Sequence, residues 1–356
     1  MVPVSSGRSY VKTKAGDGER ARRALLEAKL LDTEYKIVDE AQDLYFPLSR
    51  KVTKAKLKKI LDDIDFETGK REFVSASIGP KTLSDALEGL LPDDLHEYLP
   101  RAYDLIGDIA VLEIPDELVD FGRQIGSAFQ SLHKNFSTVL GKRGAISGTT
   151  RVRQYDLLAG QRKTKTIHTE YGCNIAVDMA KAYFSPRLLE EHNRIADLVV
   201  DDETVVDMFT GVGPFALHIA RRHRAKVYAI DVNPDAIDLL RESMELNRFI
   251  GEIIPILGDA HDYVQSSFDG DVDRVIMNHP AGAFEFVKDA CRALRVGGIM
   301  HYYDFAGGDD PESSFQKKIE GLVSETGRGV ETVQLVRRVR DSAPYEYQMV
   351  ADLVIR

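Results

Sequence analysis

The sequence predicts an α/β fold in which a doubly wound, largely parallel sheet follows smaller α+β domains. From about residue 181 onward, short apolar segments of strand length alternate with segments of helical periodicity. Alternation of this kind builds a parallel sheet with helices on both faces. We expect strands at 204–208, 226–230, 253–257, 274–277 and 299–303, helices at 213–222, 234–247, 283–294 and 312–325, and a closing β-pair at 330–337 and 347–355.

The chain divides by composition into four parts. We expect a small α+β module at 1–70, a linker at 71–82, a second α+β domain at 83–180 and the sheet domain at 181–356. The module is indicated by helical segments at 20–31 and 54–64 and by strand-like alternation at 36–48. The linker is suggested by polar residues and glycines between 65 and 82.

The bulk composition is that of an ordinary globular protein. Hydrophobic residues make up 43% and charged residues 29% of the 356 residues. No apolar run approaches the roughly 18 residues of a membrane span, and the first ten residues lack the layout of a signal peptide. Cys173 and Cys291 are far apart and lack metal-ligand spacing. We therefore expect a cytoplasmic protein with no membrane partner and no metal site.

The second domain combines a strand at 108–114 and a helix at 116–136 with a basic, glycine-containing segment that reads as a loop. The net charge of −10 argues weakly against a nucleic-acid partner, but binding depends on the local field. Against the single acid Asp156, residues 141–168 carry seven cations: Lys142, Arg143, Arg151, Arg153, Arg162, Lys163 and Lys165. A second basic run, at 50–59, is equally well explained as a solvated surface.

A cofactor site is predicted at residues 205–234. Gly211 and Gly213 follow an apolar strand and allow a tight turn with close backbone approach to a ligand. The third glycine of a dinucleotide motif and the Gly-Lys-Ser/Thr of a P-loop are both absent. Asp207 is placed to pair with the ammonium of an amino-acid cofactor, Asp231 with the hydroxyls of a ribose, and Asp259 with an adenine amino group. Three acids at three strand ends indicate S-adenosylmethionine.

The fourth strand ends in Asn278-His279-Pro280-Ala281, at the edge where a transferred methyl group should lie. Amino-group methyltransferases carry Asn/Asp-Pro-Pro-aromatic there, and the aromatic ring stacks on an extruded base. Ala281 has no ring to stack. Exocyclic-amine chemistry is thereby disfavoured without being excluded, and His279 is expected to line the loop.

A helix is expected after Tyr183-Phe184-Ser185-Pro186-Arg187, with Ser185 as its N-cap and Pro186 at its first position. Its apolar stripe comprises Leu188, Ile195, Leu198 and Val199. Glu191 falls within that stripe. Two interpretations stand open: a partly desolvated carboxylate with a raised pKa, suited to a general base, or a carboxylate paired with a neighbouring arginine.

These blocks together resemble the archaeal and eukaryotic tRNA (guanine-N1)-methyltransferases that modify position 37. The resemblance spans nearly the whole chain and rests on Arg151-Val-Arg153, Leu158–Arg162, Thr166-Ile-His168, Tyr183–Arg187, Asp207–Phe215, Ala229–Asp231 and Asn278-x-Pro280. His279 stands where the family usually has leucine, and Leu189-Glu190-Glu191-His192 also departs from the family pattern.

The resemblance implies a Rossmann-like class I methyltransferase fold that uses S-adenosylmethionine and works as a monomer on tRNA. Glu191 would take the N1 proton of guanine, Arg151 would stabilise charge on O6, and Asn278 and Pro280 would fix the base. The cofactor would be framed by Arg187, Asp207, Phe209, Gly211, Gly213, Asp231, Asn233 and Asp259. The N-terminal module would recognise the outer corner of the tRNA, and other tRNA contacts would come from Tyr183, Lys142, Arg143, Arg153, Arg162, Lys163 and Lys165.

Two alternatives remain. A wyosine-pathway enzyme of the same fold would transfer an aminocarboxypropyl group, or would add methylation of a wyosine precursor. A non-catalytic RNA-binding protein would keep only a relic cofactor pocket. Arg151 and Glu191 favour methyl transfer, and the three strand-end acids argue against a relic.

Overall fold

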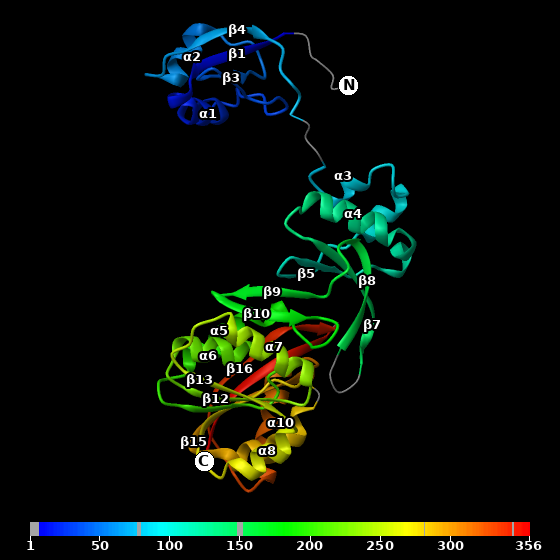
Figure 1. Cartoon of the computed structure of the whole chain (residues 1–356), viewed down its shortest axis with the longest axis vertical. Coiled ribbons are helices and arrows are strands. Elements are labelled where there is room, and N and C mark those ends of the chain that lie inside the picture. Colours follow the sequence, from blue (N-terminus) through cyan, green and yellow to red (C-terminus); the bar gives the residue numbers. More distant parts are fainter. Residues whose placement is uncertain (1–6, 77–79, 148–151, 281, 344) are drawn as a thin grey trace. The chain divides into compact units, whose positions relative to one another are not determined.

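The computed structural model describes residues 7–76, 80–147, 152–280, 282–343 and 345–356. The chain forms two compact units, Met1–Ala86 and Leu87–Arg356 (Figure 1). Arg151, Ala281 and the tip of the basic segment lie outside the described residues. None of the helices in the described part combines the length and apolar character needed to span a bilayer.

The first unit is a small antiparallel sheet covered by two helices. The strands β1 (Arg8–Lys14), β2 (Val38–Glu40), β3 (Asp43–Pro47) and β4 (Glu67–Arg71) lie in the order β2-β3-β1-β4. The helices α1 (Gly18–Glu27) and α2 (Lys54–Leu61) pack on it through a core that includes Leu25, Phe46 and Leu57. The sequence prediction missed β1 and β4. Strand β4 is largely exposed and polar, so only its backbone pairing with β1 defines it.

The second unit is built on a seven-stranded sheet, which confirms the predicted fold. Its strands are β11 (Thr204–Asp207), β12 (Lys226–Asp231), β13 (Glu252–Leu257), β14 (Val272–Met277), β15 (Leu294–Gly307), β16 (Val330–Ala343) and β17 (Glu346–Ile355). The order is β13-β12-β11-β14-β15-β17-β16, and only the pairings of β17 are antiparallel. The connections diverge on either side of β11, so a crevice opens at the carboxyl ends of β11 and β14.

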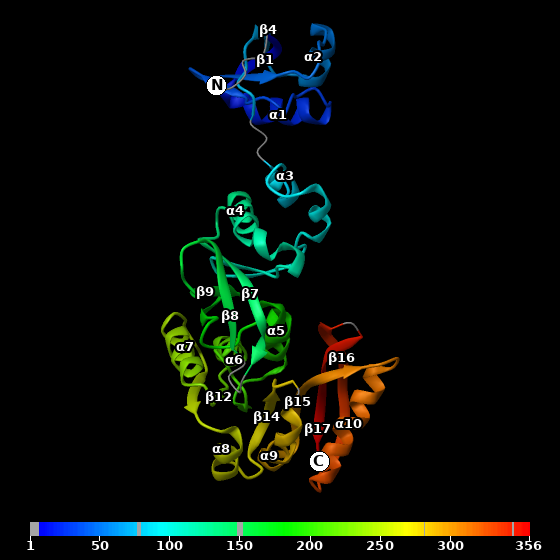
Figure 2. The same ribbon diagram turned by 90° about the vertical axis from the view of Figure 1, so that its right-hand side faces the viewer.

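Helices cover both faces of this sheet (Figures 1 and 2). One face packs against α5 (Leu189–Leu198), α6 (Pro214–Arg222) and α7 (Pro234–Glu245). The other packs against α8 (Ala260–Ser267), α9 (Val287–Ala293) and α10 (Pro311–Glu325). Of these, α8 was not predicted, because it is short and contributes only two fully buried side chains.

The remainder of the second unit is a four-stranded sheet with one long helix. The strands β5 (Tyr103–Ile106), β6 (Ile109–Leu112), β7 (Thr138–Ser147) and β8 (Val152–Gly160) pair in chain order, and α4 (Gly122–Leu132) packs against β7 and β8. The pair β9 (Lys165–Glu170) and β10 (Cys173–Asp178) follows, and a short helix α3 (Leu83–Leu87) precedes the sheet.

The prediction that the basic segment is a loop was wrong. Most of it belongs to the long antiparallel pair β7–β8 and to β9. On β8, Tyr155 and Leu157 pack toward the core while Gln154 and Asp156 are exposed. This alternation is the period of a strand, and the charged side chains on the open face concealed it.

A buried chain of polar side chains crosses the sheet beneath α5. Arg274 is 2% exposed and donates to Glu203 from Nε at 2.8 Å. Its Nη1 lies 2.7 Å from His301 Nε2, which must accept because a guanidinium only donates. His301 Nδ1 therefore carries the proton and donates to Asp352 Oδ1 at 2.6 Å.

The same chain continues into α5. Arg194 donates from Nη1 to Asp352 Oδ2 at 2.5 Å and from Nη2 to Glu191 Oε2 at 2.9 Å. Burial alone would raise the pKa of Asp352, but His301 and Arg194 outweigh it and lower that pKa. The carboxylate is thus ionised and clamps α5 to the sheet.

Replacing Asp352 with asparagine should lower the free energy of unfolding of the second unit by about 3–5 kcal/mol, because Arg194 and His301 lose a buried partner. Asp197→Asn is the matched control: Asp197 pairs with Arg222 but its side chain is 60% exposed, so its loss should cost less than about 1 kcal/mol. Urea unfolding followed by circular dichroism measures both. Equal costs would show that the buried chain does not stabilise the fold.

Candidate functional site

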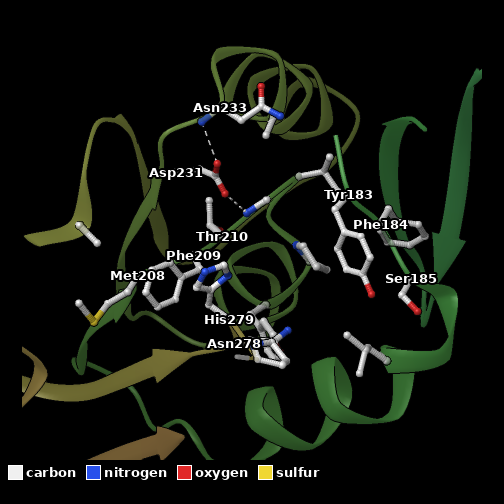
Figure 3. A pocket seen from close by; sticks show the side chains of 18 of the residues that line it. Tyr183, Phe184, Ser185, Met208, Phe209, Thr210, Asp231, Asn233, Asn278 and His279 are labelled. Atoms are coloured by element: carbon white, nitrogen blue, oxygen red, sulfur yellow. Dashed lines mark hydrogen bonds between the residues drawn. The ribbon is translucent and has the colours of Figure 1, made fainter. Parts of the chain in front are cut away.

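A cavity of about 490 Å³ lies at the carboxyl ends of β11, β12 and β14. Most of its walls come from five segments, 183–185, 208–212, 231–233, 258–260 and 278–280, and the rest from residues that include Leu188, His192, Arg340 and Gln348. We call it the larger cavity, because a second, smaller one is described below. Figure 3 shows Tyr183 and Ser185 on one side of it, with Phe209 and Asn278 on the other. The sequence-predicted cofactor segment and the end of the fourth strand therefore share one cavity.

The turn between β11 and α6 has a backbone conformation that favours glycine at two positions. Gly211 and Gly213 have φ values of +55° and +83°, which side chains with a Cβ rarely adopt. A Cβ on Gly213 would lie 2.3 Å from Leu240 Cδ1. Pro214 then begins α6 at a position where no amide hydrogen is needed.

Asp207 ends β11 beneath this turn and is fully buried. Among the described residues, no group meets the geometry of a hydrogen bond to either of its carboxylate oxygens. Burial raises the pKa of Asp207 to about 7, and the nearby Thr210 hydroxyl and Phe209 amide oppose that rise only in part. Because a buried carboxylate without a hydrogen-bond donor is costly, a cationic ligand group next to Asp207 would stabilise it.

Asp231 ends β12 and faces the same turn (Figure 3). Its two oxygens accept from the backbone amides of Gly211 at 2.7 Å and Asn233 at 2.9 Å. Asn233 in turn caps α7, accepting from the Asp235 amide, and donates to the Lys181 carbonyl at 2.8 Å. Burial raises the pKa of Asp231. The carboxylate is held rigidly, and each oxygen retains a second lone pair for a ligand hydroxyl.

Asp259 follows β13 and lines the cavity, where its Oδ1 caps α8 by accepting from the His261 amide at 2.7 Å. Phe209 also lines the cavity, and its ring lies 4.9 Å from the rings of both His279 and Phe286. The cavity thus offers both a carboxylate acceptor and an aromatic surface, which suit an adenine ring.

The end of β14 is oriented by side chains that the sequence prediction missed. Asn278 Oδ1 accepts from Gln348 Nε2 at 3.2 Å, and Gln348 Oε1 accepts from Arg340 Nε at 2.7 Å. Arg340 also donates to Ser185 Oγ and Tyr183 Oη, both at 3.1 Å. Gln348 is 1% exposed, and a buried amide in an otherwise apolar strand is the one signal that would have revealed it.

Ser185 does not cap α5 as the sequence suggested. Its side chain caps no amide and instead accepts from Arg340, while a short 3₁₀ turn, Pro186–Leu188, leads into α5. The predicted apolar stripe is correct for Leu188, Ile195 and Val199, but Leu198 is 43% exposed, and His192 is buried as well.

Glu191 is 1% exposed, and the structure supports the second of its two interpretations. Its carboxylate accepts from Arg194 Nη2 at 2.9 Å, from Tyr303 Oη at 2.7 Å and from Arg337 Nη2. Glu191 does not line the larger cavity, although Leu188 and His192 on the same helix do. The carboxylate is therefore fully engaged in this structure.

The predicted cofactor ligand Arg187 is placed elsewhere. It lines a second cavity of about 150 Å³ and donates from Nε to Asp104 Oδ1 at 2.6 Å. The predicted tRNA contacts Arg153 and Lys142 line this smaller cavity too. The structure does not bring Arg187 into the larger cavity, because Asp104 on β5 competes for it.

The other predicted tRNA-binding cations lie on the surface. Arg143 pairs with Asp156, Lys163 with Asp108 and Lys165 with Glu242, while Arg162 is exposed. Among the described residues, no group of three or more histidine, cysteine, aspartate or glutamate side chains is arranged to hold a metal ion.

The residues of the larger cavity fit S-adenosylmethionine. The fixed Asp231 suits its ribose, and Asp259 and Phe209 suit its adenine. Asp207 does not line the cavity but is buried next to the lining residue Met208, and its carboxylate suits the ammonium. The glycine turn brings backbone close to the ligand where a Cβ would clash with the packing beneath it.

Three family models match successive parts of the chain. Residues 11–56 match the tRNA methyltransferase 5 N-terminal domain, residues 83–164 the TYW2 N-terminal domain, and residues 166–330 the TRM5/TYW2 methyltransferase domain. The last match contains the larger cavity's glycine turn and all three strand-end acids.

Relatives match over nearly the full length. The tRNA (guanine(37)-N(1))-methyltransferase Trm5b of Pyrococcus abyssi is 36% identical, covering 96% of this chain and 97% of its own. Trm5b of Methanocaldococcus jannaschii is 37% identical, covering 97% and 98%. The solved complex of aTrm5 and tRNALeu superposes with a TM-score of 0.78 at 35% identity, covering 98% of this chain and 99% of that one. The chain belongs to the TRM5/TYW2 family of methyltransferases.

Proposed function

We propose that this protein transfers the methyl group of S-adenosylmethionine to N1 of guanosine at position 37 of tRNA. The observation that carries the proposal is that one cavity joins the glycine turn and two of the strand-end acids, Asp231 and Asp259, to the Asn278–Pro280 edge, while Asp207 is buried directly before the lining segment 208–212. Relatives of the same length that bear this activity in their names support the choice of acceptor.

The bound cofactor supplies an electrophilic methyl group on a sulfonium centre. Asp207 and Asp231 hold that cofactor, and the glycine turn keeps it against the strand ends. Asn278 fixes the orientation of the guanine, because its own amide is held by Gln348 and Arg340. Orientation of this kind lowers the barrier by converting a bimolecular step into one within the complex.

Guanine N1 becomes nucleophilic when its proton leaves, and the proposed acceptor of that proton is the Glu191 carboxylate. In the structure all its lone pairs are directed at Arg194, Tyr303 and Arg337. One partner must therefore give way to the base. Arg337 lies on the edge strand β16 with 38% of its side chain exposed, whereas Arg194 is anchored by Asp352. Arg337 is the partner we expect the RNA to displace.

Arg151 keeps its proposed role as donor to the guanine O6, where negative charge develops as N1 loses its proton. Arg187 is better explained as an RNA contact than as a cofactor ligand, since it lines the smaller cavity. The surface cations of β7–β9 would add phosphate contacts that make binding salt-dependent.

The N-terminal unit fits a module that recognises the outer corner of tRNA, as its match to a tRNA methyltransferase 5 domain supports. We place the protein in the cytoplasm as a monomer. A wyosine-pathway activity is the second candidate, favoured by the match of residues 83–164 to a TYW2 domain.

Incubating the purified protein with methyl-labelled cofactor and unmodified tRNA transcripts should yield labelled N1-methylguanosine at position 37. Mapping the product nucleoside by mass spectrometry separates the two candidates. An aminocarboxypropyl adduct, or no modified guanosine at all, would contradict the proposal. Transcripts with adenosine at position 37 are the matched control and should stay unlabelled.

Cofactor affinity should rise with pH up to about pH 7. Asp207 has a pKa of about 7 without a ligand, and an ammonium beside it would lower that pKa, so binding releases a proton. Below pH 7 the dissociation constant should then increase by up to about tenfold per pH unit. Calorimetry in buffers of different ionisation enthalpy measures both effects. The Asp207→Asn variant should bind the cofactor weakly at every pH. If its affinity still changed with pH as in the wild type, Asp207 would be excluded as the titrating group.

A further inference from the structure

The smaller cavity adjoins the larger one. Tyr183, Ser185 and Arg340 contribute to the walls of both. The rest of its lining comes mainly from the four-stranded sheet, with Asp104 on β5, Lys142 on β7 and Arg153 on β8. A ligand group in the smaller cavity would therefore lie next to whatever occupies the Tyr183 side of the larger cavity, which Arg340 and Gln348 connect to Asn278.

The lining of the smaller cavity is strongly positive. Among the described residues of this lining, the cations are Lys142, Arg153, Arg187 and Arg340, and the one acid is Asp104. The Asp104 carboxylate contacts Lys142 Nζ at 3.1 Å and Arg187 Nε at 2.6 Å. Burial alone would raise the pKa of Asp104, but these two cations outweigh it and lower that pKa. One ionised carboxylate thus faces two cations.

The remaining positive charge is not balanced within the lining. The Arg340 guanidinium donates hydrogen bonds to Tyr183, Ser185 and Gln348, which are all neutral. Lys142 has one more acid within reach, Glu113, but that side chain is 71% exposed and outside the lining. An excess of three positive charges around about 150 Å³ favours an anion.

We infer that the smaller cavity binds one phosphate group of the RNA backbone, next to the nucleotide whose base enters the larger cavity. This inference rests on the proposed function. A base that is rotated out of its stack carries its own phosphates with it, so an anion site must lie within one nucleotide of the base site. Arginine pairs with phosphate through two parallel hydrogen bonds, which suits Arg153 and Arg187.

The cofactor carboxylate is the other anion that could occupy this site. The position of the cations favours the phosphate, because Lys142 and Arg153 belong to β7 and β8, outside the matched methyltransferase domain at 166–330. Tyr155 adds a hydroxyl to the lining, and burial raises its pKa, so it stays a hydrogen-bond donor.

The test uses full-length tRNA in which a single phosphate, on the 5′ or the 3′ side of position 37, is replaced by an uncharged methylphosphonate. For the wild-type protein one of the two substitutions should raise KM about tenfold, the loss expected for one charge-assisted contact. Arg153→Gln should raise KM similarly on unmodified tRNA. Combining that variant with the sensitive methylphosphonate should add little, because both changes remove the same contact.

Matched variants separate this contact from other effects. Arg292→Gln removes an exposed cation on α9 that pairs with Asp269 and lines neither cavity, and should leave KM unchanged. Arg153→Lys should raise KM less than Arg153→Gln does, since lysine keeps the positive charge. The dissociation constant for S-adenosylmethionine should be unaffected in both Arg153 variants.

Additive losses in the combined experiment, or equal KM values for all phosphate replacements, would overturn the inference. Weakened cofactor binding by Arg153→Gln without a change in methylphosphonate sensitivity would assign the cavity to the cofactor carboxylate instead. Failure of the wild-type protein to methylate unmodified tRNA would contradict the proposed function itself, which keeps the two failures distinct.

Discussion

The contact on which this structure depends is the buried pair between Arg194 and Asp352. It joins residues 158 positions apart and fixes α5 against the strand β17. Without it, the buried Asp352 carboxylate would keep only the neutral His301 as a partner, and Arg194 would keep only Glu191 as an ionised one. The same guanidinium holds Glu191, so the interaction that stabilises the second unit also sets where the proposed base stands.

The β16–β17 hairpin contributes side chains to both cavities and to Glu191. Arg340 and Gln348 connect it to Asn278 at the larger cavity, and Arg340 also lines the smaller one. Arg337, which lies on β16 with Arg340, donates a hydrogen bond to the Glu191 carboxylate. A single edge of the sheet thus touches the base site, the proposed phosphate site and the proposed general base. RNA that binds along this edge would contact all three at the same time.

Sequence alone predicted the parts of the protein that repeat a strong local pattern. The strands from β11 to β15, the glycine turn and the acids at three strand ends follow from apolar runs and spacing. The exposed strand β4 and the basic pair β7–β8 were missed because their polar faces hide the period of a strand. The partners of Glu191 were out of reach, since Tyr303 and Arg337 meet it only through tertiary packing.

The central claim is that Glu191 accepts a proton only after Arg337 has left it. The most direct measurement is the single-turnover rate of methyl transfer at saturating tRNA for Arg337→Gln and for Glu191→Gln. The account predicts that Arg337→Gln keeps a rate close to that of the wild type, while Glu191→Gln slows by about 10²–10⁴ with unchanged cofactor affinity. An Arg337→Gln rate as low as that of Glu191→Gln would contradict it, because methyl transfer would then require the Arg337 guanidinium instead of its departure.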